Sequence, residues 1–192
     1  MQIDGDHMIQ GGDHGMALRL AKATDAPCLK TLMDAAIAEL LKPYLPPQGV
    51  RASFDIMGLD TQLIADGCYF AVEASGEIVG CGGWSRRATL FGGDHSGGRD
   101  AALLDPASEP ARVRAMYTHP SHVRRGIGRM ILAACEAAAA AEGFSACELA
   151  ATLAGEPLYR ACGYEQVERF TAPTSLGVDV PLVRMRKRLS AR

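Results

Sequence analysis

The segment from residue 111 to residue 143 constrains the fold of this chain more than any other. It begins with an alternating run, "ARVRAMYT", which predicts a β-strand. It ends with "GRMILAACEAAAAAEG", which predicts an apolar helix that stops at Gly143. Between these runs stands "HPSHVRRGI", in which two arginines directly precede a glycine. A strand therefore gives way to a long helix through a short, basic loop that contains glycine.

Such a loop has the chemistry of an anion site. The first N–H groups of a helix have no partner inside the helix, and the positive end of the helix dipole lies behind them. Gly126 and Gly128 let a ligand approach the backbone without a Cβ in the way, and Arg124, Arg125 and Arg129 add charge. The pattern favours a diphosphate. The alternative is a tight turn with solvated surface arginines.

Two other phosphate-binding loops do not fit this segment. A Walker A loop would end in GK[ST], and "GIGRM" does not. A dinucleotide-binding fingerprint would need a third glycine where Ile131 stands. We therefore expect neither of these nucleotide-binding motifs.

The rest of the chain alternates between strand-like and helix-like runs. This predicts a mixed α/β fold, as a single domain over residues 16–192 after a loose tail over 1–15, with a largely antiparallel sheet and helices on both faces. The predicted strand at 111–118 places Val113, Ala115 and Tyr117 on one face. The other expected elements are a strand at 16–23, a helix capped by Thr24 that ends near Pro43 before an "LPPQG" turn, a helix at 54–67, a hairpin of 68–74 and 77–87, a strand at 144–151, a short helix within 155–164 and a last strand at 178–190.

Composition narrows the classes of partner. Of the 192 residues, 48% are hydrophobic and 22% are charged, as in ordinary globular proteins, and the formal net charge is −2. We therefore expect no general affinity for nucleic acid or for an anionic membrane. No apolar run is long enough to span a bilayer, and the beginning of the chain lacks a signal-peptide pattern, so we expect a cytoplasmic protein.

The cysteines and histidines give no strong signal for a disulfide framework or a metal site. The six cysteines form no CxxC pair, so we expect reduced, mostly buried thiols, with a disulfide framework as the alternative. His7, His14 and His95 lie beside aspartates but without the fixed spacing of metal ligands, so we expect no metal. Cys162 has no histidine close in sequence to activate it, which favours a buried thiol over a nucleophile.

Three motifs together carry a resemblance to a known family. They are "RAMYTHP", "VRRGIGRMIL" and, after one further strand, "LYRACGY". Over residues 112–170 the chain resembles the GNAT superfamily of acetyl-CoA-dependent N-acetyltransferases, and "LRLAKATDAPCLKTL" is similar to the family's opening strand and helix. The resemblance implies a domain that uses acetyl-CoA as its co-substrate.

The resemblance also implies where the cofactor binds. In this family the loop usually reads Q/R-x-x-G-x-G/A, and its amides hold the diphosphate of coenzyme A. Here Val123 stands in the first position, and the matching residues are Arg124, Arg125, Gly126, Ile127, Gly128 and Arg129. The preceding strand usually splays at a bulge, where its free backbone groups receive the pantetheine arm and polarise the thioester. Those positions are Met116, Tyr117 and Thr118.

A tyrosine on the family's last short helix normally reaches the sulfur of coenzyme A. The matching residue is Tyr159, in "PLYRACGY", and the resemblance implies that it is catalytic. The alternative for Tyr159 is a core aromatic in a packed helix. An asparagine often stands seven residues earlier to contact the cofactor, and this chain has Thr152 there. Trp84 either lines the acceptor pocket or only packs in the core.

The implied reaction is direct attack of a neutral primary amine on the thioester, without an acyl-enzyme. An amine with the pKa of lysine, about 10.4, is almost wholly protonated at neutral pH, so a base or a proton path is required. Many relatives carry a glutamate on the strand before the loop, where this chain has Arg112 and Arg114. The remaining candidates for the base are Asp105, Glu109, Glu73 and His119.

The sequence alone does not identify the acceptor amine. A small metabolite, an antibiotic, a peptide N-terminus and a lysine side chain all fit, and the loop at 88–110 and the first two helices would shape the pocket. The chain acts either alone or as a homodimer. A second hypothesis is a sensor or partner module that binds acyl-CoA without catalysis. The departures at Val123 and Thr152 and the missing glutamate leave it open, whereas Tyr159 argues against it.

Overall fold

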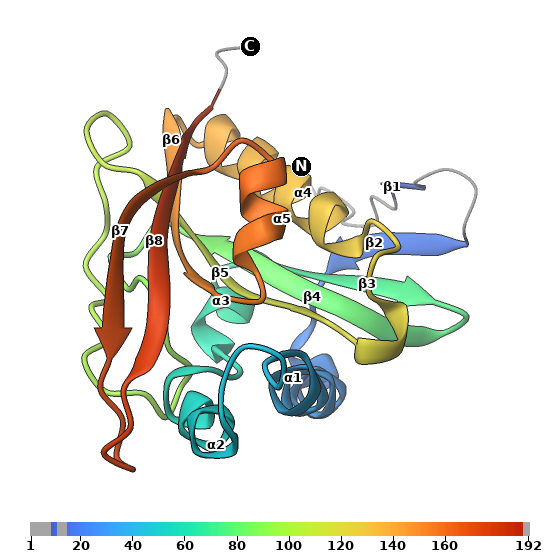
Figure 1. Cartoon of the computed structure of the whole chain (residues 1–192). Helices are drawn as coiled ribbons and strands as arrows, with labels where there is room; N and C mark the ends of the chain where they lie inside the picture. The colour runs from blue at the N-terminus through green and yellow to red at the C-terminus, as the bar shows by residue number, and fades with distance from the viewer. Residues whose placement is uncertain (1–8, 11–14, 190–192) are drawn as a thin grey trace.

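The computed structural model describes residues 9–10 and 15–189, which form one sheet with helices on both of its faces (Figure 1). The strand order is β1-β2-β3-β4-β5-β6-β8-β7, and every neighbouring pair is antiparallel except β5 with β6. The strands are β1 (Ile9–Gln10), β2 (Met16–Leu20), β3 (Tyr69–Ala74), β4 (Glu77–Ser85), β5 (Ala111–Thr118), β6 (Ala146–Thr152), β7 (Glu165–Ala172) and β8 (Val180–Arg188).

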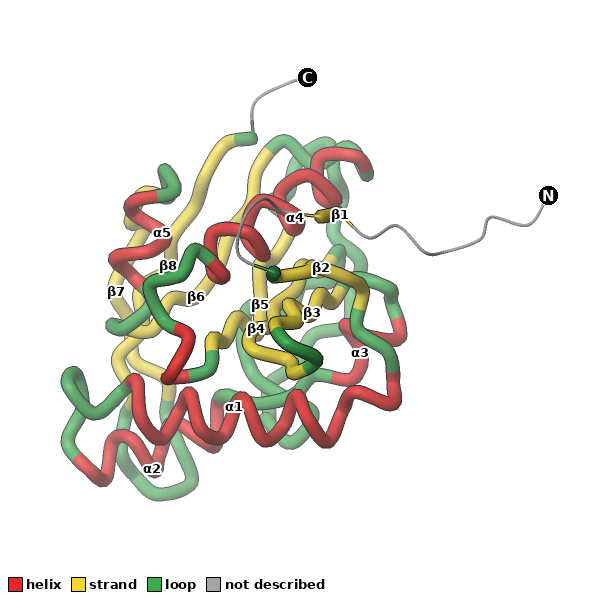
Figure 2. Tube along the Cα trace, turned by 90° about the vertical axis from the view of Figure 1, so that its right-hand side faces the viewer, coloured by secondary structure: helices red, strands yellow, loops and turns green. Residues whose placement is uncertain are grey.

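The helices pack on the sheet through their buried residues. They are α1 (Ala26–Leu40), α2 (Pro47–Ile56), α3 (Thr61–Ala65), α4 (Ile127–Ala141) and α5 (Glu156–Ala161). On one face α4 buries Ile131 and Leu132, and on the other α1 buries Leu29 and Met33. Figure 2 shows α1 and α4 on opposite sides of the strands. The predicted mixed α/β fold, with a largely antiparallel sheet and helices on both faces, is confirmed.

β5 pairs with β6 only where the two strands begin. Ala111 lies opposite Cys147 and Arg112 lies opposite Glu148, and no further pair follows among the described residues. From residue 113 onward the two strands separate. The edge of β5 that faces β6 is therefore free of a strand partner over most of its length.

β5 also carries a bulge against β4. The register shifts between Cys81 and Gly83, and Ala115 has a φ of 50°, in the left-handed region. The extra residue reverses the alternation of side chains. Val113 accordingly packs in the core under α4, and Tyr117 packs on the other face, with α1. The prediction that Val113, Ala115 and Tyr117 share a face is therefore wrong.

Other elements differ from the sequence prediction in extent. The "LPPQG" segment does not form only a turn, because α2 begins at Pro47, a position in the first turn where proline is tolerated. The predicted helix at 54–67 is the end of α2 followed by the short α3. Thr24 lies inside a 3₁₀ turn, and Asp25 precedes α1 in its place. β7 escaped prediction because most of its residues are exposed, so it shows no apolar alternation.

Of the predicted loose tail at 1–15, the structure describes Ile9–Gln10 and Gly15. The two residues of β1 pair with Leu18 and Ala17 of β2. His7 and His14 lie outside the described residues. Across 9–10 and 15–189, no cluster of three histidine, cysteine or acidic side chains is placed to hold a metal ion, and no helix is long and apolar enough to cross a membrane.

All six cysteines are free, and burial controls their reactivity. It raises the pKa of Cys68 to about 11 and that of Cys81 to about 12, so both stay protonated at about pH 8. We expect a chromogenic disulfide reagent to modify the exposed Cys28 and the half-buried Cys162 in the folded protein, and the other thiols only after unfolding. Rapid reaction of Cys68 or Cys81 in the folded protein would contradict this.

Gly80 on β4 sets how closely α4 approaches the sheet. A Cβ at this position would lie 2.3 Å from Cγ2 of Ile127, the first residue of α4. We expect Gly80→Ala to lower the free energy of unfolding by about 1–3 kcal/mol, measured by urea denaturation, because the helix must move away. The control is Gly97→Ala, whose added Cβ meets nothing within 4 Å and should change stability by less than about 0.5 kcal/mol. Equal stability of the two variants would rule out this close packing.

Candidate active site

The loop before α4 has the conformation that an anion site needs. Arg124 has a φ of 65° and Gly126 a φ of 84°, both in the left-handed region. Gly126 is the N-cap of α4 and no side chain caps the helix, so the N–H groups of its first turn lack an acceptor within the helix. Residues in the left-handed conformation can turn neighbouring N–H groups to one side, as in loops that bind anions.

This loop opens into a cavity of about 590 Å³. Parts of α1, β5, α4, β6 and α5 form its wall. Of the predicted cofactor residues, those that line it are Met116, Tyr117, Thr118, Arg124, Gly126, Ile127, Gly128 and Arg129. Arg125 does not line it. The structure thus brings the end of β5 and the first turn of α4 together around one space, as the sequence predicts.

The two loop glycines are required for different reasons. Gly126 adopts a positive φ, and a Cβ there would meet nothing within 4 Å. At Gly128 an added Cβ would lie 2.7 Å from Cδ2 of Leu158, a residue of α5. Gly128 therefore leaves room for the Leu158 side chain of α5 against the first turn of α4, a role that the sequence pattern did not reveal.

Tyr159 lies on α5 and lines the same cavity. Its ring packs edge to face with that of Tyr164, with 5.9 Å between the ring centroids. Burial raises the pKa of Tyr159, so its hydroxyl stays protonated at neutral pH and can donate a hydrogen bond. Thr152 Oγ1 accepts a hydrogen bond from the Gly155 N–H at 3.1 Å, which fixes the residue before α5.

A smaller cavity of about 100 Å³ adjoins the first. Its wall includes parts of β5, β6 and α5, together with the end of α2, residues 90–92 and β8. The Tyr117 hydroxyl accepts a hydrogen bond from the Gly58 N–H at 2.9 Å, which holds the tyrosine in place. Two molecules, one in each cavity, would therefore meet at the shared residues. These are Met57, Met116, Tyr117, Thr152, Gly155 and Tyr159.

None of the four candidates for a base lines either cavity. Glu73 pairs with Arg19 at 2.6 Å, and Glu109 accepts a hydrogen bond from the Asp105 N–H at 2.8 Å. His119 bonds Ser121 Oγ at 2.7 Å, on the turn before the loop. Within the described part of the chain, no carboxylate of any kind contributes to the wall of these two cavities.

Trp84 packs in the core and lines neither cavity. Its ring meets that of Phe144 edge to face, with 6.1 Å between centroids, and Arg86 lies over it. Of the two alternatives for Trp84, the structure favours packing.

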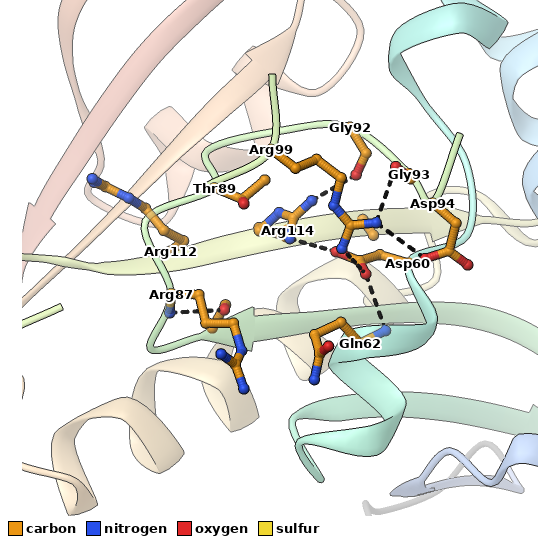
Figure 3. Close-up of polar contacts among 12 residues, drawn as sticks. Asp60, Gln62, Arg87, Thr89, Gly92, Gly93, Asp94, Arg99, Arg112 and Arg114 are labelled. Carbon is orange, nitrogen blue, oxygen red and sulfur yellow. Dashed lines mark hydrogen bonds and ion pairs between the residues drawn. The ribbon is translucent and has the colours of Figure 1, made fainter. Parts of the chain in front are cut away.

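A buried ion-pair network beside the smaller cavity was not predicted from the sequence. The Arg114 side chain is 3% exposed, and its Nη1 donates to Asp60 at 2.5 Å. Its Nη2 donates to the Gly92 carbonyl at 2.6 Å. Asp60 is wholly buried and also accepts from Arg99 at 2.6 Å (Figure 3). The only part of this network that a local sequence pattern could have revealed is Asp60, which caps α3 by accepting a hydrogen bond from the Gln62 N–H.

Comparisons with known proteins agree with this geometry. Residues 65–166 match the family model described as the acetyltransferase (GNAT) domain. No curated protein matches the sequence. Among solved structures, a GCN5-related N-acetyltransferase from Rhodopseudomonas palustris has a TM-score of 0.67 at 20% identity, over 96% of this chain and 100% of that chain.

Two further solved structures share the fold. The PaiA N-acetyltransferase from Thermoplasma acidophilum, in complex with coenzyme A, has a TM-score of 0.59 at 11% identity, over 90% of this chain and 98% of that chain. The ribosomal-protein-S18-alanine N-acetyltransferase from Escherichia coli has a TM-score of 0.57 at 14% identity, over 92% and 96%. Because the family model spans more than half of the sequence, the chain belongs to the GNAT acetyltransferase family.

Proposed function

We propose that the protein is an N-acetyltransferase that moves the acetyl group of acetyl-CoA to a primary amine by direct attack. One observation carries the proposal. The first turn of α4, the free edge of β5 and the Tyr159 side chain all border the same cavity. A site for an anion therefore lies next to a strand edge that can bind an extended ligand and next to a phenol that can donate a proton.

The cofactor's parts have matching places in this cavity. The N–H groups of Ile127 and Gly128 are suited to the diphosphate, with Arg124 and Arg129 adding charge. The pantetheine arm would lie along the free edge of β5, since its amides need backbone partners. The similar PaiA protein was solved in complex with coenzyme A, which supports coenzyme A as the ligand.

The transfer itself would take place where the two cavities meet. The neutral amine attacks the thioester carbonyl carbon, the C–N bond forms, the C–S bond breaks and coenzyme A leaves as a thiolate. Tyr159 donates its proton to that sulfur, the proton from the attacking nitrogen passes to water, and water returns a proton to the Tyr159 phenolate. Among the described residues no cysteine or serine lines either cavity, which supports direct transfer over an acyl-enzyme.

The acceptor amine would enter through the smaller cavity, because the larger one is bordered by the anion site. A small molecule and a peptide N-terminus both fit this scheme. The similar Escherichia coli protein is named for an alanine of a ribosomal protein, which is in keeping with a peptide amine. A cytoplasmic location and a homodimeric assembly stay predictions.

Coenzyme A should stabilise the folded protein. At a ligand concentration of about 100 times Kd, binding to the folded state alone adds about 2.7 kcal/mol, which a thermal melt detects as a higher Tm. Gly128→Val should abolish the shift, because its side chain would push Leu158 toward the cavity. Arg125→Ala is the control and should keep most of the shift, since Arg125 does not line the cavity. A wild-type Tm that saturating coenzyme A leaves unchanged would contradict the proposed cofactor site.

Tyr159→Phe keeps the ring and removes the proposed acid. We expect kcat to fall by roughly 10²-fold while the KM for acetyl-CoA and the Tm stay nearly unchanged, as followed by thiol release. The matched control is Tyr44→Phe, which alters a partly exposed tyrosine in the wall of the same cavity and should leave kcat unchanged. A Tyr159→Phe enzyme with the wild-type kcat would show that another group protonates the sulfur.

The same assay addresses the alternative of a non-catalytic binder. A wild-type protein that binds coenzyme A but acetylates no amine across a broad panel would fit a sensor or partner module instead. Release of thiol that depends on both acetyl-CoA and an amine would exclude that alternative.

A further inference from the structure

His122 lies in the wall of the larger cavity, beside the loop that precedes α4. It is the last residue of a 3₁₀ turn, η2 (Pro120–His122), and its side chain is half-buried. Val123 and Arg124 follow it directly and line the same cavity. Histidine is the side chain whose ordinary titration falls near neutral pH. This residue therefore brings a group of variable charge to the wall that is proposed to hold a diphosphate.

A chain of hydrogen bonds fixes how the His122 ring is turned. His119 Nδ1 accepts from the Ser121 N–H at 3.2 Å, so that nitrogen carries no hydrogen. The Ser121 hydroxyl lies 2.7 Å from the same nitrogen and must therefore donate to it. The Ser121 oxygen is left to accept from His122 Nδ1, which lies 2.9 Å away. The hydrogen of a neutral His122 ring consequently sits on Nδ1.

The other ring nitrogen of His122, Nε2, is free to meet a ligand. Nδ1 is directed at Ser121, and Nε2 has no hydrogen-bond partner among the described residues. In the neutral ring Nε2 presents a lone pair and can only accept, whereas in the protonated ring it is a charged N–H donor. A phosphate oxygen is a negatively charged acceptor, so it binds the protonated ring and not the neutral one.

The wall around His122 offers no other negative partner for a protonated ring. Arg124 and Arg129 line the same cavity, and the first turn of α4 adds the positive end of the helix dipole. No carboxylate of the described residues lines this cavity. The other titratable groups of the wall are phenols, which ordinarily ionise at about pH 10; they are those of Tyr44, Tyr117 and Tyr159. A bound diphosphate would therefore supply the negative charge.

The helix that packs against η2 does not change this balance. α1 carries two acidic residues near its end, Asp34 and Glu39, and each has a lysine partner on the surface. Asp34 pairs with Lys30 at 2.7 Å, and Glu39 pairs with Lys42 at 2.6 Å. The part of α1 that lines the cavity is apolar.

We propose that His122 binds the diphosphate of coenzyme A through a protonated Nε2, so that the cofactor's binding is accompanied by the uptake of a proton. The proton comes from the solvent and stays on Nε2 while the ligand is bound. This inference rests on the proposed cofactor site and adds to it a residue and a pH dependence. Because the complex favours the protonated ring, the added affinity is present at low pH and is lost as the pH rises.

Dephospho-coenzyme A is the probe that isolates this effect. The 3′-phosphate of coenzyme A titrates at about pH 6 by itself, whereas the diphosphate keeps its charge throughout the neutral range. We expect calorimetric titration of the wild type at equal ionic strength to give a Kd roughly tenfold lower at about pH 6 than at about pH 8. At about pH 7 the binding enthalpy should vary with the ionisation enthalpy of the buffer, which reports the proton taken up.

Two variants assign the pH dependence to His122. His122→Gln removes the titrating group, so its Kd at about pH 6 should rise to the wild-type value at about pH 8 and should no longer change with pH. His122→Arg supplies a permanent positive charge, so its binding should be equally tight at both pH values. The control is His95→Gln, because His95 bonds the Phe54 carbonyl at 2.7 Å and does not line the cavity. It should keep the wild-type pH dependence.

The outcomes separate the role of His122 from the cofactor site on which it rests. A wild-type Kd for dephospho-coenzyme A that is equal at both pH values would overturn the role of His122 and leave the site standing. The same holds if the pH dependence survives in His122→Gln, or if it appears only with coenzyme A itself, which would place it on the 3′-phosphate. Should His122→Gln not fold, the pH dependence of His122→Arg decides. If neither ligand binds at either pH, the proposed cofactor site is wrong.

Discussion

The separation of β5 from β6 after Arg112 is the constraint on which the rest of the site depends. Two parallel strands that stayed paired would bond each other along their whole length and leave no edge for a ligand. The bulge at Ala115 requires a left-handed conformation that costs a residue with a Cβ about 1–2 kcal/mol. The Tyr69 hydroxyl donates to the Ala115 carbonyl at 2.7 Å, which offsets part of that cost and fixes the bulge.

The elements around the gap between β5 and β6 form the walls of the two cavities. On one side, Gly128 leaves room for the Leu158 side chain of α5, and the loop before α4 and the Tyr159 side chain border one cavity. On the other side, Asp60 holds Arg114 of β5 and Arg99 of the loop that carries residues 90–92. Removing one partner of a buried ion pair typically costs about 3–5 kcal/mol, so this network fixes the wall of the smaller cavity firmly.

Local sequence patterns predicted the parts of the site that form from neighbouring residues. The loop of Arg124 to Gly128 follows from glycines at a helix start, whereas Tyr159 was marked only by the resemblance of its short helix to the GNAT family. The Asp60 network could not be predicted in this way, because Asp60 lies 54 residues from Arg114 and 39 from Arg99. Similarly, alternation along β5 gave the wrong faces, since a bulge is set by the partner strand and leaves no mark in the periodicity.

We infer that a single coenzyme A molecule contacts both the first turn of α4 and the free edge of β5. A crystal structure of the protein with coenzyme A tests it most directly. We expect the diphosphate against the N–H groups of the first turn of α4, the pantetheine arm hydrogen-bonded to the free edge of β5, and the sulfur within reach of the Tyr159 hydroxyl. Coenzyme A bound elsewhere, or a pantetheine arm that leaves the cavity without contacting β5, would contradict the account.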